Sequence, residues 1–129
     1  MREMSERGAT SPEQAAEDKR KAREVLDSGG DARLAYRLLS QAVEAAPDAD
    51  SLVLMAEIEV ANPLWRQRAL DHFKQALDIE PRLTAAWLGL GNYWSLRGQP
   101  EKQCRCLEKI LVYDPNNREV RSALDLLRK

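Results

Sequence analysis

The chain has 129 residues, 43% of them hydrophobic and 32% charged, and its 20 basic and 21 acidic residues leave a net charge of −1. This size and composition suit one globular domain. The balanced charge does not favour nucleic-acid binding, which usually needs a basic face, and no apolar run approaches the roughly 20 residues of a membrane span. The polar start shows no signal peptide, so we expect the chain in the cytoplasm.

Local start and stop signals divide the chain into seven predicted helices. Residues 1–10 are expected to be a disordered segment or linker, so the folded domain is expected over residues 11–129. Ser11 is a typical N-cap, proline follows it and Gln14 completes a capping box. Turn residues end the following helices. The predicted helices are Pro12–Ser28, Ala32–Ala46, Asp48–Ala61, Leu64–Ile79, Arg82–Leu96, Pro100–Tyr113 and Asn117–Arg128.

A period of 34 residues runs through these helices. Pro47, Pro81 and Pro115 share this spacing. A pair of short helices cannot bury its apolar face alone, so such repeats stack, and the last unit needs a cover. Three further sets of positions share the period: Ala35, Ala69 and Gln103; Leu39, Phe73 and Leu107; Ala42, Ala76 and Ile110. The predicted units cover about 16–49, 50–83 and 84–117, with a capping helix over 118–129.

Motif residues accompany the period. The third unit has Trp87, Leu90 and Gly91 at the spacing Trp-x2-Leu-Gly, and the second has Ala69 and Phe73 before its proline. These features resemble the tetratricopeptide repeat (TPR) family. The resemblance implies an all-α fold, a right-handed α-solenoid of three helix-turn-helix units plus a capping helix. It also implies a non-catalytic protein–protein interaction module, such as an adaptor, scaffold or co-chaperone module.

The candidate site is the concave groove that the resemblance implies. The best-known ligand mode of the family grips a C-terminal carboxylate with Lys, Asn and Arg, and this chain does not match that set. The middle of its groove is apolar, which favours an amphipathic helix or an extended apolar peptide as partner. The predicted groove residues are Arg20, Leu54, Ile58, Leu88, Gly89, Asn92 and Leu96.

Two glycines stand two residues apart inside one predicted helix, although glycine costs about 1 kcal/mol relative to alanine there. Gly91 occupies the glycine position of the motif, and we expect its small size to accommodate Gln103 of the next helix. Gly89 has no such role within the repeat. We therefore expect Gly89 to let a ligand approach the helix backbone, and Asn92 to hydrogen-bond the ligand main chain.

The sequence shows no arrangement typical of catalysis. It contains no P-loop, metal motif or set of Ser, His and Asp. We expect His72 and Cys106 to be exposed on the convex face, and two ligands fall short of the four that a zinc site needs. No enzyme activity, metal or cofactor is predicted. Two alternatives stay open: self-assembly into a homo-oligomer, and a C-terminal regulatory module of a larger multidomain bacterial protein, where similar TPR modules occur.

Overall fold

The computed structural model describes residues 11–129, so the expectation for residues 1–10 lies outside the described residues. The described part contains helices and turns but no strand, which confirms the all-helical prediction. Its seven helices are α2 (Pro12–Asp27), α3 (Ala32–Ala45), α4 (Ala49–Ala61), α5 (Arg66–Ile79), α6 (Thr84–Leu96), α7 (Pro100–Tyr113) and α8 (Arg118–Leu127).

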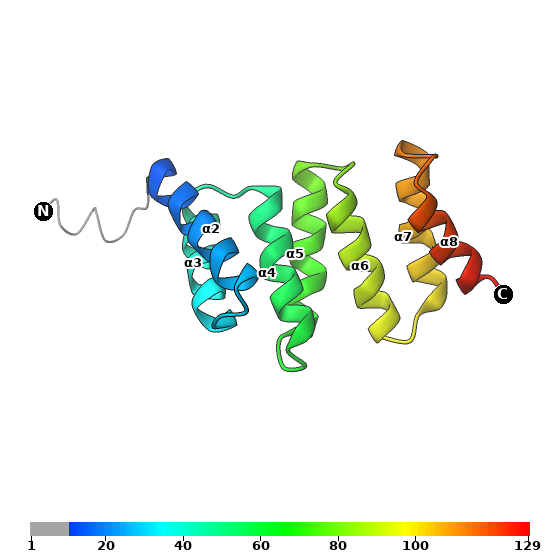
Figure 1. Ribbon diagram of the computed structural model, residues 1–129, viewed down its shortest axis with the longest axis horizontal. Helices are drawn as coiled ribbons and strands as arrows, with labels where there is room; N and C mark the ends of the chain where they lie inside the picture. The colour runs from blue at the N-terminus through cyan, green and yellow to red at the C-terminus, as the bar shows by residue number, and fades with distance from the viewer. Residues whose placement is uncertain (1–10) are drawn as a thin grey trace, which may run out of the picture.

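The helices lie side by side in chain order along the long axis of the molecule, from α2 at one end to α8 at the other (Figure 1). Each helix packs against the next helix in the chain, and α4 also contacts α6. Neighbours in sequence are therefore neighbours in space. This is the packing order expected when each helix pair rests on the pair before it.

The helix ends agree with the predicted ends to within two residues because local signals set them. Gly29 and Gly98 have φ values of 74° and 70°, a left-handed conformation that glycine adopts without strain. Beyond Gly29, the backbone N–H of Gly30 donates to the carbonyl of Val25 at 2.7 Å. The residue after Gly98 makes the equivalent bond to α6 at 2.9 Å. Both helices therefore end in a Schellman motif.

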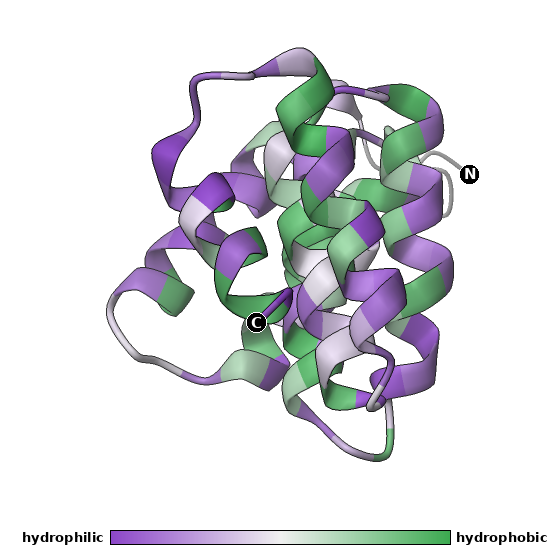
Figure 2. Cartoon of the chain, turned by 90° about the vertical axis from the view of Figure 1, so that its right-hand side faces the viewer, coloured by the Kyte–Doolittle hydropathy of each residue, from purple (hydrophilic) through white to green (hydrophobic). Residues whose placement is uncertain are grey.

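Helix α4 is the most enclosed element. It carries eight buried residues, and α3, α5 and α6 all contact it. The largest apolar cluster joins α4, α5 and α6 around Phe73 and Tyr93. In Figure 2, hydrophobic and hydrophilic segments alternate along the helices, as expected when one side of each helix is buried. None of the helices in residues 11–129 is both long and apolar enough to cross a lipid bilayer.

Helix α8 covers the last helix pair. Its Val120 and Leu124 are buried against Leu107 and Ile110 of α7. The outer side of α8 is mostly polar, with Glu119, Arg121 and Asp125 exposed, but Leu126 is also 68% exposed. The described chain therefore ends on a helix that buries one apolar side and leaves another leucine in solvent.

Candidate functional site

A pocket of about 930 Å³ opens between α2, α4, the start of α3 and the loop 62–65. Leu26, Leu54, Ile58 and Trp65 form its apolar wall. Leu64 also lines the pocket and is 89% exposed, the most exposed of the large hydrophobic residues described. A concave apolar site of this volume is large enough for several ligand side chains. This pocket is our candidate functional site.

The loop that carries Leu64 and Trp65 is held by local hydrogen bonds. The Asn62 side-chain oxygen accepts from the backbone N–H of Leu64 at 3.0 Å, which is an Asx turn. The Asn62 carbonyl accepts from the backbone N–H of Trp65 at 2.9 Å, and the Arg66 side chain donates to the Val60 carbonyl at 2.9 Å. Leu64 therefore projects from an ordered turn rather than from a loose one.

The rim of the pocket carries both signs of charge. Arg23, Arg33, Asp27 and Glu57 are all among its lining residues. Partial burial raises the pKa of the Glu57 carboxyl group, and the nearby charge of Arg23 counteracts part of that effect. Because the charges balance, the rim gives little preference for an acidic or a basic ligand. Apolar contact with the wall is the main attraction that the pocket offers.

The structure brings only two of the predicted groove residues into this pocket. Leu54 and Ile58 are half-buried in its wall, where they also pack against the cluster of α2 and α3. Leu88 is 44% and Leu96 49% exposed, and Asn92 is exposed on the same helix, α6. These three α6 residues lie outside the pocket lining.

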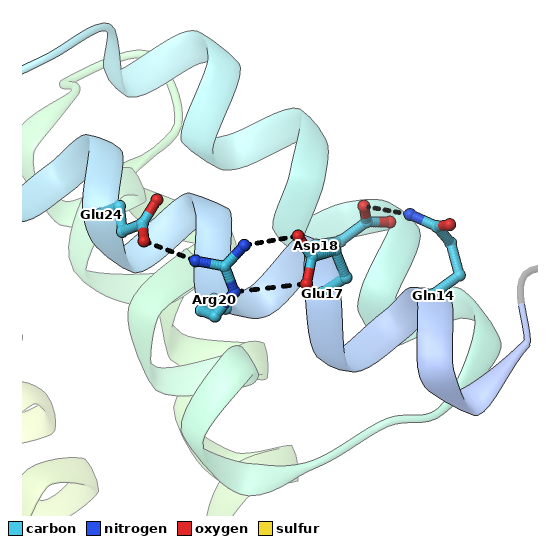
Figure 3. A network of polar contacts seen from close by, with 5 residues as sticks. All are labelled: Gln14, Glu17, Asp18, Arg20 and Glu24. Carbon is cyan, nitrogen blue, oxygen red and sulfur yellow. Dashed lines mark hydrogen bonds and ion pairs between the residues drawn. The ribbon is translucent and has the colours of Figure 1, made fainter.

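Arg20 is held by carboxylates of its own helix. It donates to Glu17, three residues before it, and to Glu24, four residues after it (Figure 3). Next to this cluster, Asp18 is only 4% exposed and accepts from the Gln14 side-chain amide at 2.9 Å. Three of the five N–H donors of Arg20 are used in these bonds, and the two glutamates beside it reduce its attraction for a carboxylate of a ligand.

The expectation that Gly89 leaves room for a ligand is wrong. A Cβ atom at Gly89 would lie 2.3 Å from Cε1 and 2.4 Å from Cζ of Phe73, a fully buried residue of α5. The open side of Gly89 is therefore filled by the Phe73 ring. Gly91 lies beside Gln103 as expected. A Cβ atom added at Gly91 would have Cβ of Cys106 as its nearest neighbour, at 3.5 Å, which is an ordinary contact distance. Close approach of helices thus requires Gly89 rather than Gly91.

A buried carboxylate next to the pocket escaped the sequence reasoning. Glu59 of α4 is 0% exposed. Its Oε2 accepts a hydrogen bond from the Tyr36 hydroxyl at 2.5 Å, and its Oε1 lies 2.7 Å from Nδ1 of His72. The Tyr36 ring lies 4.9 Å from the ring of Trp65, which lines the pocket. Three helices, α3, α4 and α5, therefore meet at one buried carboxyl group.

The environment of Glu59 changes how its partners titrate. The hydrogen bond to Glu59 raises the pKa of His72, and partial burial opposes that change. Burial, together with Glu59, raises the pKa of the Tyr36 hydroxyl. The sequence did contain a signal, because Glu59 falls four residues after Met55 and three after Ala56, both buried positions that share its side of the helix. Its partners were not foreseeable, since they come from two other helices.

The expected exposure of His72 and Cys106 is wrong, although Cys106 is a free thiol as expected. The His72 side chain is 22% exposed and engaged by Glu59. Cys106 is 3% exposed, and burial raises its pKa to about 11, so the sulfur stays a protonated thiol that packs as an apolar group. Within residues 11–129, no three His, Cys, Asp or Glu side chains lie close enough together to hold a metal ion.

Comparison of the chain with protein-family models and with curated protein sequences gave no match. What can be argued about its function therefore comes from its own residues and packing.

Proposed function

We propose that this chain is a non-catalytic protein–protein interaction module built of TPR-type helical repeats, and that it binds an apolar or amphipathic peptide segment of a protein partner. The 34-residue period and the consecutive packing of the helices support the repeat assignment. The observation that carries the binding role is the open apolar pocket of α2 and α4, with Leu64 protruding beside it.

The energetics favour an apolar anchor over a polar one. Burying one leucine-sized side chain contributes about 1.5–3 kcal/mol to the free energy of binding. A ligand in the pocket buries its own apolar side chain and also covers Leu64, so apolar burial on both sides stabilises the complex. Leu54 and Ile58 lie one helical turn apart on α4, so they present one continuous apolar surface. A helical ligand with apolar residues spaced three or four apart fits such a surface.

The test is selection from a library of random dodecapeptides displayed on phage, followed by anisotropy titration of the enriched peptides. We expect enriched peptides to carry apolar residues at helical spacing. Leu54→Glu is expected to weaken their binding about tenfold or more, because it places a charge in the pocket wall. Ile79→Glu is the matched control, since Ile79 is 48% exposed on α5 and lies outside this pocket.

Two results would contradict the proposal. One is a library that yields no peptide with apolar anchors, and the other is a selected peptide that binds Leu54→Glu as tightly as the unchanged chain. Leu88→Glu shows whether the ligand is confined to the pocket or extends beyond it. If it also abolishes binding, the ligand extends from the pocket across α6, as the predicted groove requires. If binding survives, the ligand occupies the pocket alone.

Self-assembly is the second candidate function, and exposed side chains of α8 favour it. Leu126 is 68% and Leu127 37% exposed at the C-terminal end of the helix row. Light scattering over a range of concentrations separates the two functions. An adaptor keeps the mass of one 14.6 kDa chain throughout. A mass that doubles with concentration, and returns to the single chain in Leu126→Glu, would support self-assembly.

A further inference from the structure

A second hollow, of about 470 Å³, lies between α6 and α7, and it shares no lining residue with the pocket of α2 and α4. Trp87 and Trp94 of α6 line it together with Val112 of α7. Val112 is 73% exposed. The apolar part of this surface is therefore covered only in part by the chain itself.

Three cations border the hollow. Lys102, Arg105 and Lys109 are exposed lining residues of α7, spaced three and four residues apart, so they share one side of the helix. The Lys102 ammonium lies 4.2 Å from the centroid of the Trp94 ring. Within residues 11–129, none of the three forms an ion pair.

The one acidic residue that lines the hollow is already engaged. Glu108 pairs with Arg128, which follows α8. Arg128 therefore offsets the one negative charge among the lining residues. The hollow consequently carries a local positive charge on a chain whose net charge is −1. That local charge is complementary to an acidic ligand.

We propose that this hollow docks an acidic segment of a partner protein, with an apolar anchor of that segment in the hollow that Trp87, Trp94 and Val112 line. Carboxylates on both sides of the anchor pair with the cations of α7, and this complementarity orients the segment and speeds its association. The docking surface is independent of the pocket proposed above, so the chain has two faces for two different kinds of peptide.

The dimensions favour an acidic peptide over nucleic acid. From Lys102 to Lys109 the helix rises about 10 Å, at roughly 1.5 Å per residue. Nucleic-acid binding rests largely on cations that neutralise a row of phosphates, which usually needs an extended basic face. Three cations around an apolar hollow instead match the few carboxylates that flank one anchor residue.

The probe for the test is a fluorescein-labelled octapeptide with a central Leu-Phe pair between two groups of three acidic residues. Anisotropy titration should show saturable binding, and adding salt should weaken it because mobile ions screen exposed charges. Two control peptides replace all acidic residues by lysine or the Leu-Phe pair by two alanines. Each control is expected to bind about tenfold more weakly, because it lacks the charges or the anchor.

Variants of the chain locate the binding. Arg105→Glu combined with Lys109→Glu, and separately Val112→Asp, should each weaken binding of the acidic octapeptide about tenfold. Lys74→Glu is the matched charge control on α5, where Lys74 is exposed and outside the hollow. Leu54→Glu is the control for the other pocket. Both controls should keep the affinity of the unchanged chain, and circular dichroism should show equal helicity in every variant.

Several results would overturn the proposal. Equal affinity for the acidic and the lysine octapeptide would remove the charge argument. Unchanged affinity in Val112→Asp and in the double charge reversal would place the peptide elsewhere. Two alternative ligands are a single-stranded oligonucleotide and a vesicle of anionic phospholipid. If either binds more tightly than the octapeptide, and the double charge reversal abolishes that binding, the surface is one for nucleic acid or for membrane. Loss of binding in Leu54→Glu alone would assign the octapeptide to the first pocket.

Discussion

Replacing each of the two glycines of α6 by alanine tests which one the packing requires. At Gly89 a new Cβ would lie 2.3 Å from Cε1 of Phe73. Carbon atoms in contact normally lie about 3.5–4.0 Å apart, so the ring and α6 would have to separate by about 1.2 Å or more. Phe73 is 0% exposed inside the largest apolar cluster, so the ring has no free space to enter. At Gly91 the nearest atom would be 3.5 Å away.

The magnitudes give opposite signs for the two changes. Overpacking a close-packed core costs about 1–3 kcal/mol, and alanine gains about 1 kcal/mol over glycine inside a helix. With contacts this short, we place the cost of overpacking at the upper end of its range. Gly89→Ala should therefore lower the free energy of unfolding by about 1–2 kcal/mol. Gly91→Ala should leave it unchanged or raise it by up to about 1 kcal/mol.

Urea unfolding followed by circular dichroism measures both changes. Phe73→Leu supplies a further check, because leucine lacks the two ring atoms that Gly89→Ala would meet. On the Phe73→Leu background, Gly89→Ala should cost less than it does on the unchanged background, and a double-mutant cycle measures that coupling. The reasoning fails if Gly89→Ala is as stable as Gly91→Ala, or if the double-mutant cycle shows no coupling between positions 73 and 89.

Three further predictions concern charges. Because the pKa of His72 is raised, its interaction with Glu59 stabilises the fold fully below pH 6.5, and this stabilisation is lost as the pH rises through the raised value. The urea midpoint of the unchanged chain should therefore fall more steeply between about pH 6 and about pH 8 than that of His72→Gln. Equal slopes of midpoint against pH would refute this. Tyr36→Phe removes a hydrogen bond from fully buried Glu59 and should cost about 1–3 kcal/mol in urea unfolding; an unchanged midpoint would show that Glu59 finds another donor. Asp48 caps α4 by accepting from the Ser51 backbone N–H at 3.1 Å and also pairs with Lys19 at 2.7 Å. Asp48→Ala should cost about 1 kcal/mol or more in thermal unfolding, while Asp48→Asn, which keeps the cap, should cost less; equal losses would assign the effect to the ion pair.

The candidate site was predictable in part. Leu54 and Ile58 were predicted because the resemblance to TPR repeats implies that they face the concave groove. The wall of the pocket also includes Leu26 of α2 and Trp65 of the loop after α4. Those contacts depend on the angle and the offset between helices, which periodicity does not contain. The same limit hid the partners of Glu59.

The sequence by itself determined where the helices begin and end, because caps and turns act within about one helical turn of the chain. Ser11, Gly29 and Gly98 each do so through bonds to residues no more than five positions away. Only the tertiary structure decided what each helix face meets. It placed the Phe73 ring over Gly89 and a histidine beside Glu59, because those distances depend on how neighbouring helices slide and rotate against each other as they pack.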